Sequence, residues 1–421
     1  MLTIIDKENF SHEKFQSICN DNNLNIVSGT NYLENLDNYD LIIKSPGISF
    51  KGINIDAFKN FLSSQLELFL SFFKGTTIGV TGSKGKSTTS SLIYKLIEEQ
   101  NTNTILLGNI GIPIFDYLDT LQDNTVVVLE LSSHQLEYIT KSPNIAILLN
   151  IFEEHLDHYN SYENYANAKY NIFKYQTKND FAIYNIDNEI IQEILNKNNL
   201  ISNQIKITFT NEEFDNNTLF IKDNKIVYKN TELYNTNDER KLLGNHNLFN
   251  IMFCLAVCNI LNLNITKAIS TINSFEGLPH RMEFVGKFNN VKYYNDSIAT
   301  IPEATIGCVE ALKEVNTLII GGMNRQINYS KFIDFLINSN IENIVCLPDA
   351  GTYIGNEILN IQKNKNYFKN IFQVSTMEEA VTISKKVTKP NTICLLSPAA
   401  ASYGFFSNFK ERGELFKKLI P

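Results

Sequence analysis

The residues best suited to carry out chemistry lie in one stretch, TTIGVTGSKGKSTT at Thr76–Thr89. Its apolar and β-branched beginning predicts a buried strand, Gly82 and Gly85 predict a tight turn, and the residues from Ser87 onward predict a helix. A glycine loop between a strand and a helix binds phosphate, because backbone N–H groups of the loop and of the first helical turn point at the phosphate oxygens. This stretch is therefore the first candidate for a functional site.

Three side chains after the second glycine strengthen this prediction. Lys86 adds a mobile positive charge, and Ser87 or Thr88 offers a hydroxyl group to Mg²⁺. The spacing is G-x-x-G-K-S-T rather than the strict P-loop pattern, so an ordinary turn with a solvated lysine is the alternative. The strand and helix predicted on either side of the loop favour phosphate binding.

Polar residues follow two further apolar runs, TVVVLELSS at Thr125–Ser133 and NIAILLNIF at Asn144–Phe152. Runs of this kind are typical of central strands that are covered on both faces. Ligands of open α/β sheets bind at the carboxyl ends of the strands, so the polar residues found there are expected to converge near the glycine loop: Glu130, Ser132, Ser133, His134, Glu153, Glu154, His155 and Asp157. Glu130 and His155 are candidates for holding a second metal ion, although each alone equally fits a solvated carboxylate or a structural histidine.

The scaffold that positions these residues is predicted to be α/β with mostly parallel sheets. Strand and helix patterns alternate over most of the 421 residues, a length that suggests two or three domains. The pattern changes at Gln65, and glycine and proline interrupt FEGLPHR at Phe275–Arg281. We therefore predict units at 1–64, 65–277 and 278–421. The first unit lacks a G-x-G turn near its start, so it is incomplete as a nucleotide-binding domain.

The composition is typical of a globular enzyme, with 43% hydrophobic and 19% charged residues. A net charge of −8 argues against general nucleic-acid binding. The six cysteines lie mostly in apolar runs without a C-x-x-C pair, which favours free thiols in a reducing cytoplasm. Neither a leader-like start nor an apolar stretch of membrane-spanning length is present, so we predict a cytoplasmic protein without membrane insertion.

Nine motifs in a fixed order resemble the Mur ligases, from about Asp6 to the C-terminus. They are GVTGSKGKST, GNIG, ELSSHQLE, LNIFEEHLDHY, YANAKYNIF, GNHNLFN, GLPHRME, NDSIAT and LLSPAAASYGFFSNFKERG. Three of them, ELSSHQLE, GLPHR and LSPAAAS, resemble the glutamate-adding members of that family in particular.

This resemblance implies a three-domain enzyme of peptidoglycan precursor synthesis. A truncated Rossmann-like N-terminal domain would hold the uridine nucleotide, a central P-loop domain would hold ATP, and a Rossmann-like C-terminal domain would bring glutamate. With ATP and Mg²⁺, the alanyl carboxylate of UDP-N-acetylmuramoyl-L-alanine would become an acyl phosphate, and the glutamate amine would then attack it. The resemblance further implies a cytoplasmic monomer.

The matching positions also imply roles for individual residues. Lys86, His155 and Lys169 would be catalytic, with Lys169 carbamylated so that it offers oxygen to magnesium. The metal ligands would be Ser87, Glu130, His155 and Lys169. The residues expected to bind ATP are Gly82, Gly85, Lys86, Ser87, Thr88, Asn250, Arg281 and Asp296. The residues expected to bind the other substrates are Asp6 for uracil, Asn109 for the alanyl end, and Thr300, Arg325, Ser402 and Phe409 for glutamate.

Two positions depart from the family pattern where glutamate is expected to bind. Ile298 replaces the lysine of the usual DSKAT, and Arg325 stands where a lysine is usual. Arginine is a planar two-pronged donor and lysine a point charge, so the second change alters recognition. Both changes resemble a variant branch that uses L-glutamate, whereas the general likeness favours D-glutamate.

Two other hypotheses remain open. One is an enzyme similar to folylpolyglutamate synthases, which share the glycine loop and glutamate chemistry, but GLPHR and LSPAAAS disfavour it. The other is a non-catalytic nucleotide-binding remnant. The presence of Lys86, Glu130, His155, Lys169 and Asp296 speaks against a remnant, because a chain released from catalysis need not keep every charged group.

Overall fold

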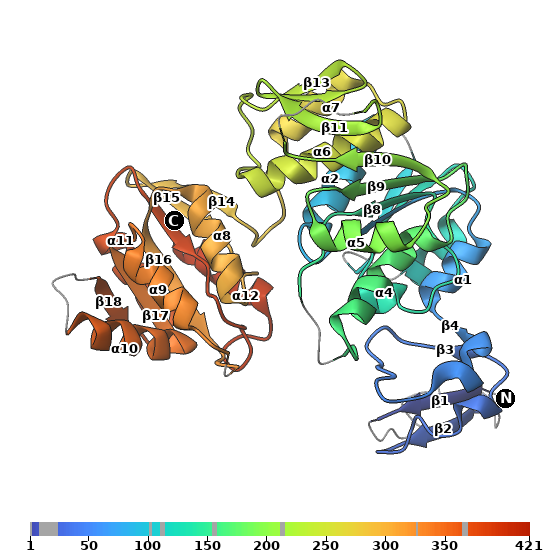
Figure 1. The fold of residues 1–421 in the computed structure, drawn as a ribbon. Coiled ribbons are helices and arrows are strands. Elements are labelled where there is room, and N and C mark those ends of the chain that lie inside the picture. The colour runs from blue at the N-terminus through green and yellow to red at the C-terminus, as the bar shows by residue number, and fades with distance from the viewer. Residues whose placement is uncertain are drawn as a thin grey trace.

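A computed structural model describes residues 2–7, 24–100, 103–109, 114–153, 158–210, 215–325, 327–363 and 369–421. Figure 1 shows three lobes in chain order: a small N-terminal unit in blue, a central domain from cyan to yellow, and a C-terminal domain from orange to red. The α/β class and the three-domain architecture expected from the sequence are therefore both present. None of the helices described is long and apolar enough to cross a bilayer.

The N-terminal unit contains two small parallel sheets. One pairs β1 (Leu2–Asp6) with β2 (Leu24–Ser28), and the other pairs β3 (Ile42–Ile43) with β4 (Leu62–Ser63). Three short 3-10 helices connect them: η2 (Leu36–Asn38), η3 (Ile55–Ala57) and η4 (Lys59–Phe61). In the described part of this unit, the buried apolar residues are Leu36, Phe50 and Phe58.

The central domain is built on a nine-stranded sheet in the order β13-β12-β11-β10-β9-β8-β5-β7-β6. Its strands are parallel from β6 to β11, and β11 to β13 form an antiparallel edge. The strands are β5 (Thr76–Thr81), β6 (Thr104–Gly108), β7 (Val126–Glu130), β8 (Ile145–Leu148), β9 (Phe181–Asn185), β10 (Asn203–Ile207), β11 (Thr218–Lys222), β12 (Lys225–Tyr228) and β13 (Thr231–Asn235). The helices are α1 (Gln65–Phe72), α2 (Lys86–Glu98), η5 (Ile114–Thr120), α3 (Ser133–Leu136), α4 (Tyr162–Lys174), α5 (Glu189–Lys197), α6 (Asn245–Ile260) and α7 (Ile265–Ser274).

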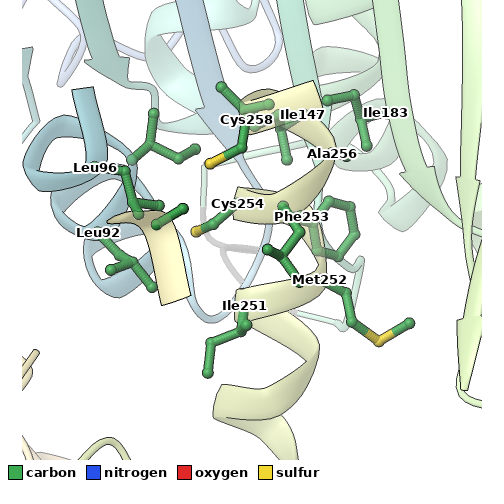
Figure 2. Close-up of a cluster of buried hydrophobic side chains, with 14 of the residues drawn as sticks. Leu92, Leu96, Ile147, Ile183, Ile251, Met252, Phe253, Cys254, Ala256 and Cys258 are labelled. Atoms are coloured by element: carbon green, nitrogen blue, oxygen red, sulfur yellow. The ribbon is translucent and has the colours of Figure 1, made fainter. Parts of the chain in front are cut away.

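Helices α2 and α6 pack together over one face of this sheet (Figure 2). Leu92 and Leu96 of α2 belong to the same buried cluster as Ile251 of α6 and Ile147 of β8. Truncating one such buried leucine to alanine costs about 2–5 kcal/mol, so this contact holds α2 rigidly against the sheet. The glycine loop enters α2 directly and is therefore anchored at its C-terminal end.

The cysteines described in the structure are free and buried, as expected. Cys254 and Cys258 lie one helical turn apart in the α2–α6 cluster (Figure 2). Burial raises the pKa of Cys258 to about 12, which keeps that thiol neutral and unreactive. Cys19 lies outside the described residues.

The C-terminal domain has a six-stranded sheet in the order β14-β15-β19-β16-β17-β18, with an antiparallel pair at one edge and parallel strands elsewhere. Buried clusters lie on both of its faces, as parallel sheets require. The strands are β14 (Glu283–Phe288), β15 (Val291–Asn295), β16 (Val315–Gly322), β17 (Asn343–Asp349), β18 (Asn370–Gln373) and β19 (Ile393–Leu396). The helices are α8 (Pro302–Leu312), α9 (Ser330–Asn338), α10 (Ala350–Gln362), α11 (Met377–Val387) and α12 (Phe409–Leu419).

Candidate active site

The glycine loop runs from the end of β5 to the start of α2, which begins at Lys86, one residue earlier than predicted. Gly85 has a left-handed φ of 89°, and a Cβ atom there would lie 2.7 Å from Oδ1 of Asn250. A Cβ atom on Gly82 would lie 2.9 Å from Cβ of Leu149. Both glycines are thus required by close contacts from other segments.

Two lysines meet at one carbonyl oxygen of this loop. Nζ of Lys86 donates to the Gly82 oxygen at 2.8 Å and to the Ser83 oxygen at 2.9 Å. Nζ of Lys169, on α4, donates to the same Gly82 oxygen at 2.9 Å, and its side chain is buried. The neighbouring Tyr165 hydroxyl lies 2.8 Å from Oγ of Ser83. The arrangement concentrates positive charge beside backbone N–H groups, which suits an anionic ligand.

Glu130 lies beside this loop, because β7 is paired with β5 and Glu130 is in register with Val80. The carboxylate is buried, and its Oε1 accepts from Nδ2 of Asn109 at 2.9 Å. Its Oε2 is buried and accepts no hydrogen bond from the described residues. A buried carboxylate oxygen left without a partner is a ligand suited to a hard cation such as Mg²⁺.

The other predicted metal ligand in this region, His155, lies outside the described residues, together with Glu154 and Asp157. In the part of the chain that is described, no group of three or more His, Cys, Asp or Glu side chains is placed to hold a metal ion. Any metal site here therefore depends on the hydroxyl of Ser87 and the carboxylate of Glu130 as its described oxygen donors.

Two polar residues near Glu130 make local contacts with neighbouring residues. Ser132 caps α3, accepting from the backbone N–H of Gln135, whose side chain accepts from the Ser132 N–H in return. His134 packs edge-on against His158 at 4.2 Å between ring centres. Helix capping and the aromatic contact therefore use these two side chains, and their convergence on the glycine loop stays a prediction.

Arg281 lies in the segment that connects the central and C-terminal domains, and Asp296 follows β15 of the C-terminal domain. Asp296 is buried at the end of β15, and its carboxylate accepts from the Met282 N–H at 3.1 Å and from Oγ of Ser397 at 2.8 Å. Burial raises the pKa of Asp296 to about 6.

Arg281 is influenced by carboxylates of both domains. Burial lowers the pKa of its guanidinium, while the charges of Asp296 and Glu130 oppose that shift. Nε of Arg281 is buried and makes no hydrogen bond to the described residues. This orphaned donor, close to acidic groups on two domains, points to a ligand-binding role.

A cleft of about 590 Å³ joins the glycine loop to Arg281 and Asp296. Of the residues predicted to bind ATP, those lining it are Gly85, Lys86, Ser87, Thr88, Asn250, Arg281 and Asp296. The structure therefore brings together residues separated by more than 200 positions. Its size fits a nucleotide-sized ligand.

Residues that the sequence predictions missed also line this cleft. Asn247 is buried, and its Oδ1 accepts from Nδ2 of Asn250 at 3.1 Å, which fixes the orientation of the Asn250 amide. The two asparagines lie three positions apart on one face of α6. Their spacing in GNHNLFN is the sequence signal that could have indicated Asn247 as a partner of Asn250.

The residues predicted to bind glutamate lie in the C-terminal domain. Arg325 donates from Nη2 to the backbone oxygen of Thr300 at 2.8 Å, and Thr300 lines the cleft. Ser402 is buried in the loop after β19, and Phe409 begins α12, where its backbone oxygen accepts from Oγ of Ser297 at 2.8 Å. Asp6, at the end of β1, lies in the separate N-terminal unit.

A second cavity of about 160 Å³ lies between the N-terminal unit and the central domain. Lys44 lines it and is buried, with Nζ 3.6 Å from Oε2 of Glu137. Burial lowers the pKa of Lys44. The sequence predictions did not include Lys44, although the adjacent SPGIS turn marks this place in the chain.

The sequence of this chain is similar to those of known enzymes. Residues 80–258 match the model of the family described as Mur ligase middle domain. The chain is 32% identical over 402 residues to the UDP-N-acetylmuramoylalanine–D-glutamate ligase of Clostridium botulinum, covering 94% of this chain and 86% of that protein. It is 34% identical over 409 residues to the enzyme of the same name from Acetivibrio thermocellus, covering 93% and 84%.

Solved structures with a similar fold come from the same group of enzymes. The MurF ligase of Thermotoga maritima in complex with ADP aligns with a TM-score of 0.58 at 18% identity, over 87% of this chain and 84% of that one. The UDP-N-acetylmuramate–alanine ligase MurC of Thermotoga maritima aligns with a TM-score of 0.61 at 19% identity, over 93% and 88%. At these identities the likeness concerns the fold.

Proposed function

This chain belongs to the Mur ligase family, and on that premise we propose that it joins glutamate to the alanyl carboxyl group of UDP-N-acetylmuramoyl-L-alanine. ATP is split to ADP and phosphate in the reaction, which belongs to peptidoglycan precursor synthesis. Relatives named for this activity match over 94% and 93% of the chain. The observation that carries the proposal is the cleft in which the glycine loop, with Lys86, faces Arg281 and Asp296.

The geometry fits the chemistry of this ligation. A carboxylate does not react with an amine directly, because oxide would have to leave. Phosphoryl transfer from ATP to the alanyl carboxylate gives an acyl phosphate, the glutamate amine attacks its carbonyl carbon, and phosphate leaves from the tetrahedral intermediate. Phosphoryl transfer and the amine attack develop negative charge on oxygen, and the cations of Lys86 and Arg281, which line the same cleft, stabilise it.

We propose that Ser87, Glu130, His155 and Lys169 hold Mg²⁺, which neutralises the charge of the ATP phosphates. The unpartnered Oε2 of Glu130 supports this proposal. Lys169 as an ammonium repels a cation, so it fits the role only after carbamylation converts Nζ into part of an oxygen donor. Its burial at the Gly82 carbonyl supports a function inside the site rather than at the surface.

The remaining residues are proposed to keep their predicted roles. Asn250 contacts adenine, Arg281 the ribose and phosphates, and Asp296 the ribose hydroxyls. Asn109 orients the alanyl end, and Asp6 meets uracil. The contact between Asn109 and Glu130 supports the role of Asn109, because it places the Asn109 amide next to the proposed metal ligand.

For the amino acid we propose D-glutamate, which the names of the relatives support. L-glutamate is the second candidate, because Ile298 lines the cleft and the Arg325 guanidinium is fixed by its bond to the Thr300 oxygen. Purified protein incubated with ATP and UDP-N-acetylmuramoyl-L-alanine is given each isomer separately, and product mass and ADP are measured. Product with D-glutamate is expected. Product with L-glutamate alone would overturn the proposal of D-glutamate as the substrate. Product with neither isomer would overturn the ligase function.

We further propose domain limits at 1–64, 65–277 and 278–421, and a monomer in the cytoplasm. Left-handed backbone at Gly277, His280 and Met282, between α7 and β14, supports a hinge at the second limit.

The buried thiols of the described cysteines support a reducing compartment. Light scattering of the purified protein tests the monomer.

A further inference from the structure

The side chain of Arg412, in the first turn of α12, is 0% exposed. Its guanidinium donates four hydrogen bonds, and every acceptor is neutral. Nε donates to Oγ of Ser297 at 3.0 Å, and Nη2 donates to the Ser297 backbone oxygen at 2.8 Å. Nη1 donates to the backbone oxygens of Ala400 at 3.1 Å and Gly321 at 3.3 Å.

This buried charge is costly for the fold. Within the described chain no carboxylate forms an ion pair with Arg412, and burial alone lowers its pKa to about 10, so it stays protonated at neutral pH. It also lies at the N-terminal end of α12, where the helix dipole disfavours a cation. Apolar residues commonly replace buried charges without loss of stability. Stability alone is therefore a poor explanation for an arginine here.

The three acceptor residues share one property, which is their position just before residues proposed to bind glutamate. Ser297 precedes Thr300 by three positions. Gly321 precedes Arg325 by four positions, and Ala400 precedes Ser402 by two.

The fourth proposed glutamate residue belongs to the same group. Phe409 stands three positions before Arg412 on α12, and its backbone oxygen accepts from Oγ of Ser297. The Arg412 guanidinium therefore hydrogen-bonds, directly or through Ser297, to every segment that carries a residue proposed to bind glutamate.

The loops after β16 and β19 meet directly around this side chain. The Met323 N–H donates to the Ala401 oxygen at 2.8 Å. A Cβ atom on Gly322 would lie 2.2 Å from that oxygen and 2.9 Å from Nη1 of Arg412. The close approach leaves no room for a bulkier residue at Gly322. Only a planar group with donors in several directions reaches the oxygens on all sides.

We propose that Arg412 is a positioning residue for glutamate, which fixes the relative placement of the loops that begin at Ser297, Gly321 and Ala400. It acts through these loops and does not touch the reacting atoms. The inference rests on the proposed ligase function and deepens it.

A matched pair of variants tests this role. Lys369 is a second buried cation of the same domain, and its Nζ donates to the backbone oxygens of Ser339 at 2.6 Å and Ile341 at 2.5 Å. Arg412→Met and Lys369→Met both remove a buried charge from backbone carbonyls, but only the first removes it from the proposed glutamate loops. Arg412→Lys keeps the charge and removes the planar fork, and it serves if Arg412→Met does not fold.

Steady-state kinetics with each substrate varied in turn gives the KM values of the variants, and thermal unfolding gives their Tm. In Arg412→Met and Arg412→Lys the KM for glutamate is expected to rise about tenfold or more, because small misplacement of binding groups is costly. The KM for UDP-N-acetylmuramoyl-L-alanine is expected to stay within about twofold, since Asp6 and Asn109, which are proposed to bind it, lie outside the C-terminal domain. Lys369→Met is expected to lower Tm with an unchanged KM for glutamate. An equal rise in all KM values, or the same rise in Lys369→Met, would overturn the inference.

A second measurement separates this inference from the proposed function. If the unaltered protein ligates neither isomer of glutamate, the proposed function fails, and hydrogen–deuterium exchange decides the role of Arg412. Faster exchange confined to the loops after Asp296, Gly321 and Ala400 in Arg412→Lys supports it. Exchange that is unchanged there, or equally fast in Lys369→Met, rejects it.

Discussion

Lys169 donates to the backbone oxygen of Gly82, a residue 87 positions earlier, at 2.9 Å, and the same oxygen accepts from Lys86 at 2.8 Å. The two amines come from α2 and α4, and their position beside the glycine loop suits the bound phosphate and the carbamate that the proposed function requires.

Carbamylation of Lys169 is the first prediction. Protein equilibrated with carbon-13-labelled bicarbonate is expected to show a carbamate resonance by NMR that is absent from Lys169→Ala. The same variant is expected to lose about 100-fold or more in turnover, the typical cost of removing one charge-stabilising group. Lys174→Ala, an exposed lysine at the end of the same helix, is the control and should keep full activity. A resonance that persists in Lys169→Ala would contradict this assignment.

Lys86 is predicted to be essential for turnover. Lys86→Ala is expected to reduce kcat for ADP formation by about 100-fold or more, because the phosphoryl group loses a preorganised cation. Lys95→Ala removes a lysine of the same helix that pairs with Glu98 on the surface, and should leave kcat unchanged. If Lys86→Ala keeps more than a small part of the activity, the loop does not bind the reacting phosphates.

Glu130 is predicted to set the magnesium requirement. Glu130→Gln keeps the size of the side chain and an oxygen for Asn109, but removes the negative charge beside the buried Oε2. The Mg²⁺ concentration for half-maximal turnover is expected to rise about tenfold or more, since a neutral amide binds a hard cation less well. Titration of activity with Mg²⁺ measures this, and an unchanged half-maximal concentration would remove Glu130 from the metal site.

Asp296 is predicted to make stability depend on pH. Burial raises the pKa of its carboxyl to about 6, from an ordinary value of 3.8. Between these values the folded state binds more protons than the unfolded state, so stability falls as pH rises from about 4 to about 6 and is constant above. The shift corresponds to about 3 kcal/mol.

Asp296→Asn removes this titration and supplies the comparison. The Tm of the wild type relative to Asp296→Asn is expected to fall from pH 4 to pH 6 and to level off above about pH 6. Parallel Tm curves for the two proteins over that range would show that the carboxyl of Asp296 titrates normally. The comparison of the two curves cancels the contribution of all other carboxyl groups.

Local sequence was sufficient for the elements that carry the glycine loop. The apolar run, the glycines and the helical pattern at Thr76–Thr89 each act within a few residues, and the strand and helix formed where predicted. The apolar runs at Thr125–Ser133 and Asn144–Phe152 formed strands β7 and β8, as expected. Periodicity and turn chemistry are local properties, so they can be interpreted without a fold.

The contacts that complete the site were decided by tertiary structure. The burial of Lys169 at Gly82 and the approach of Asn250 to Gly85 join distant segments, and the sequence contains no local pattern for either. Arg412 was within a quoted motif, but its four neutral acceptors come from three loops that meet only after the sheet of the C-terminal domain has formed. Sequence fixes which groups are present and which elements form, whereas charge, burial and hydrogen bonding depend on distances that folding alone sets.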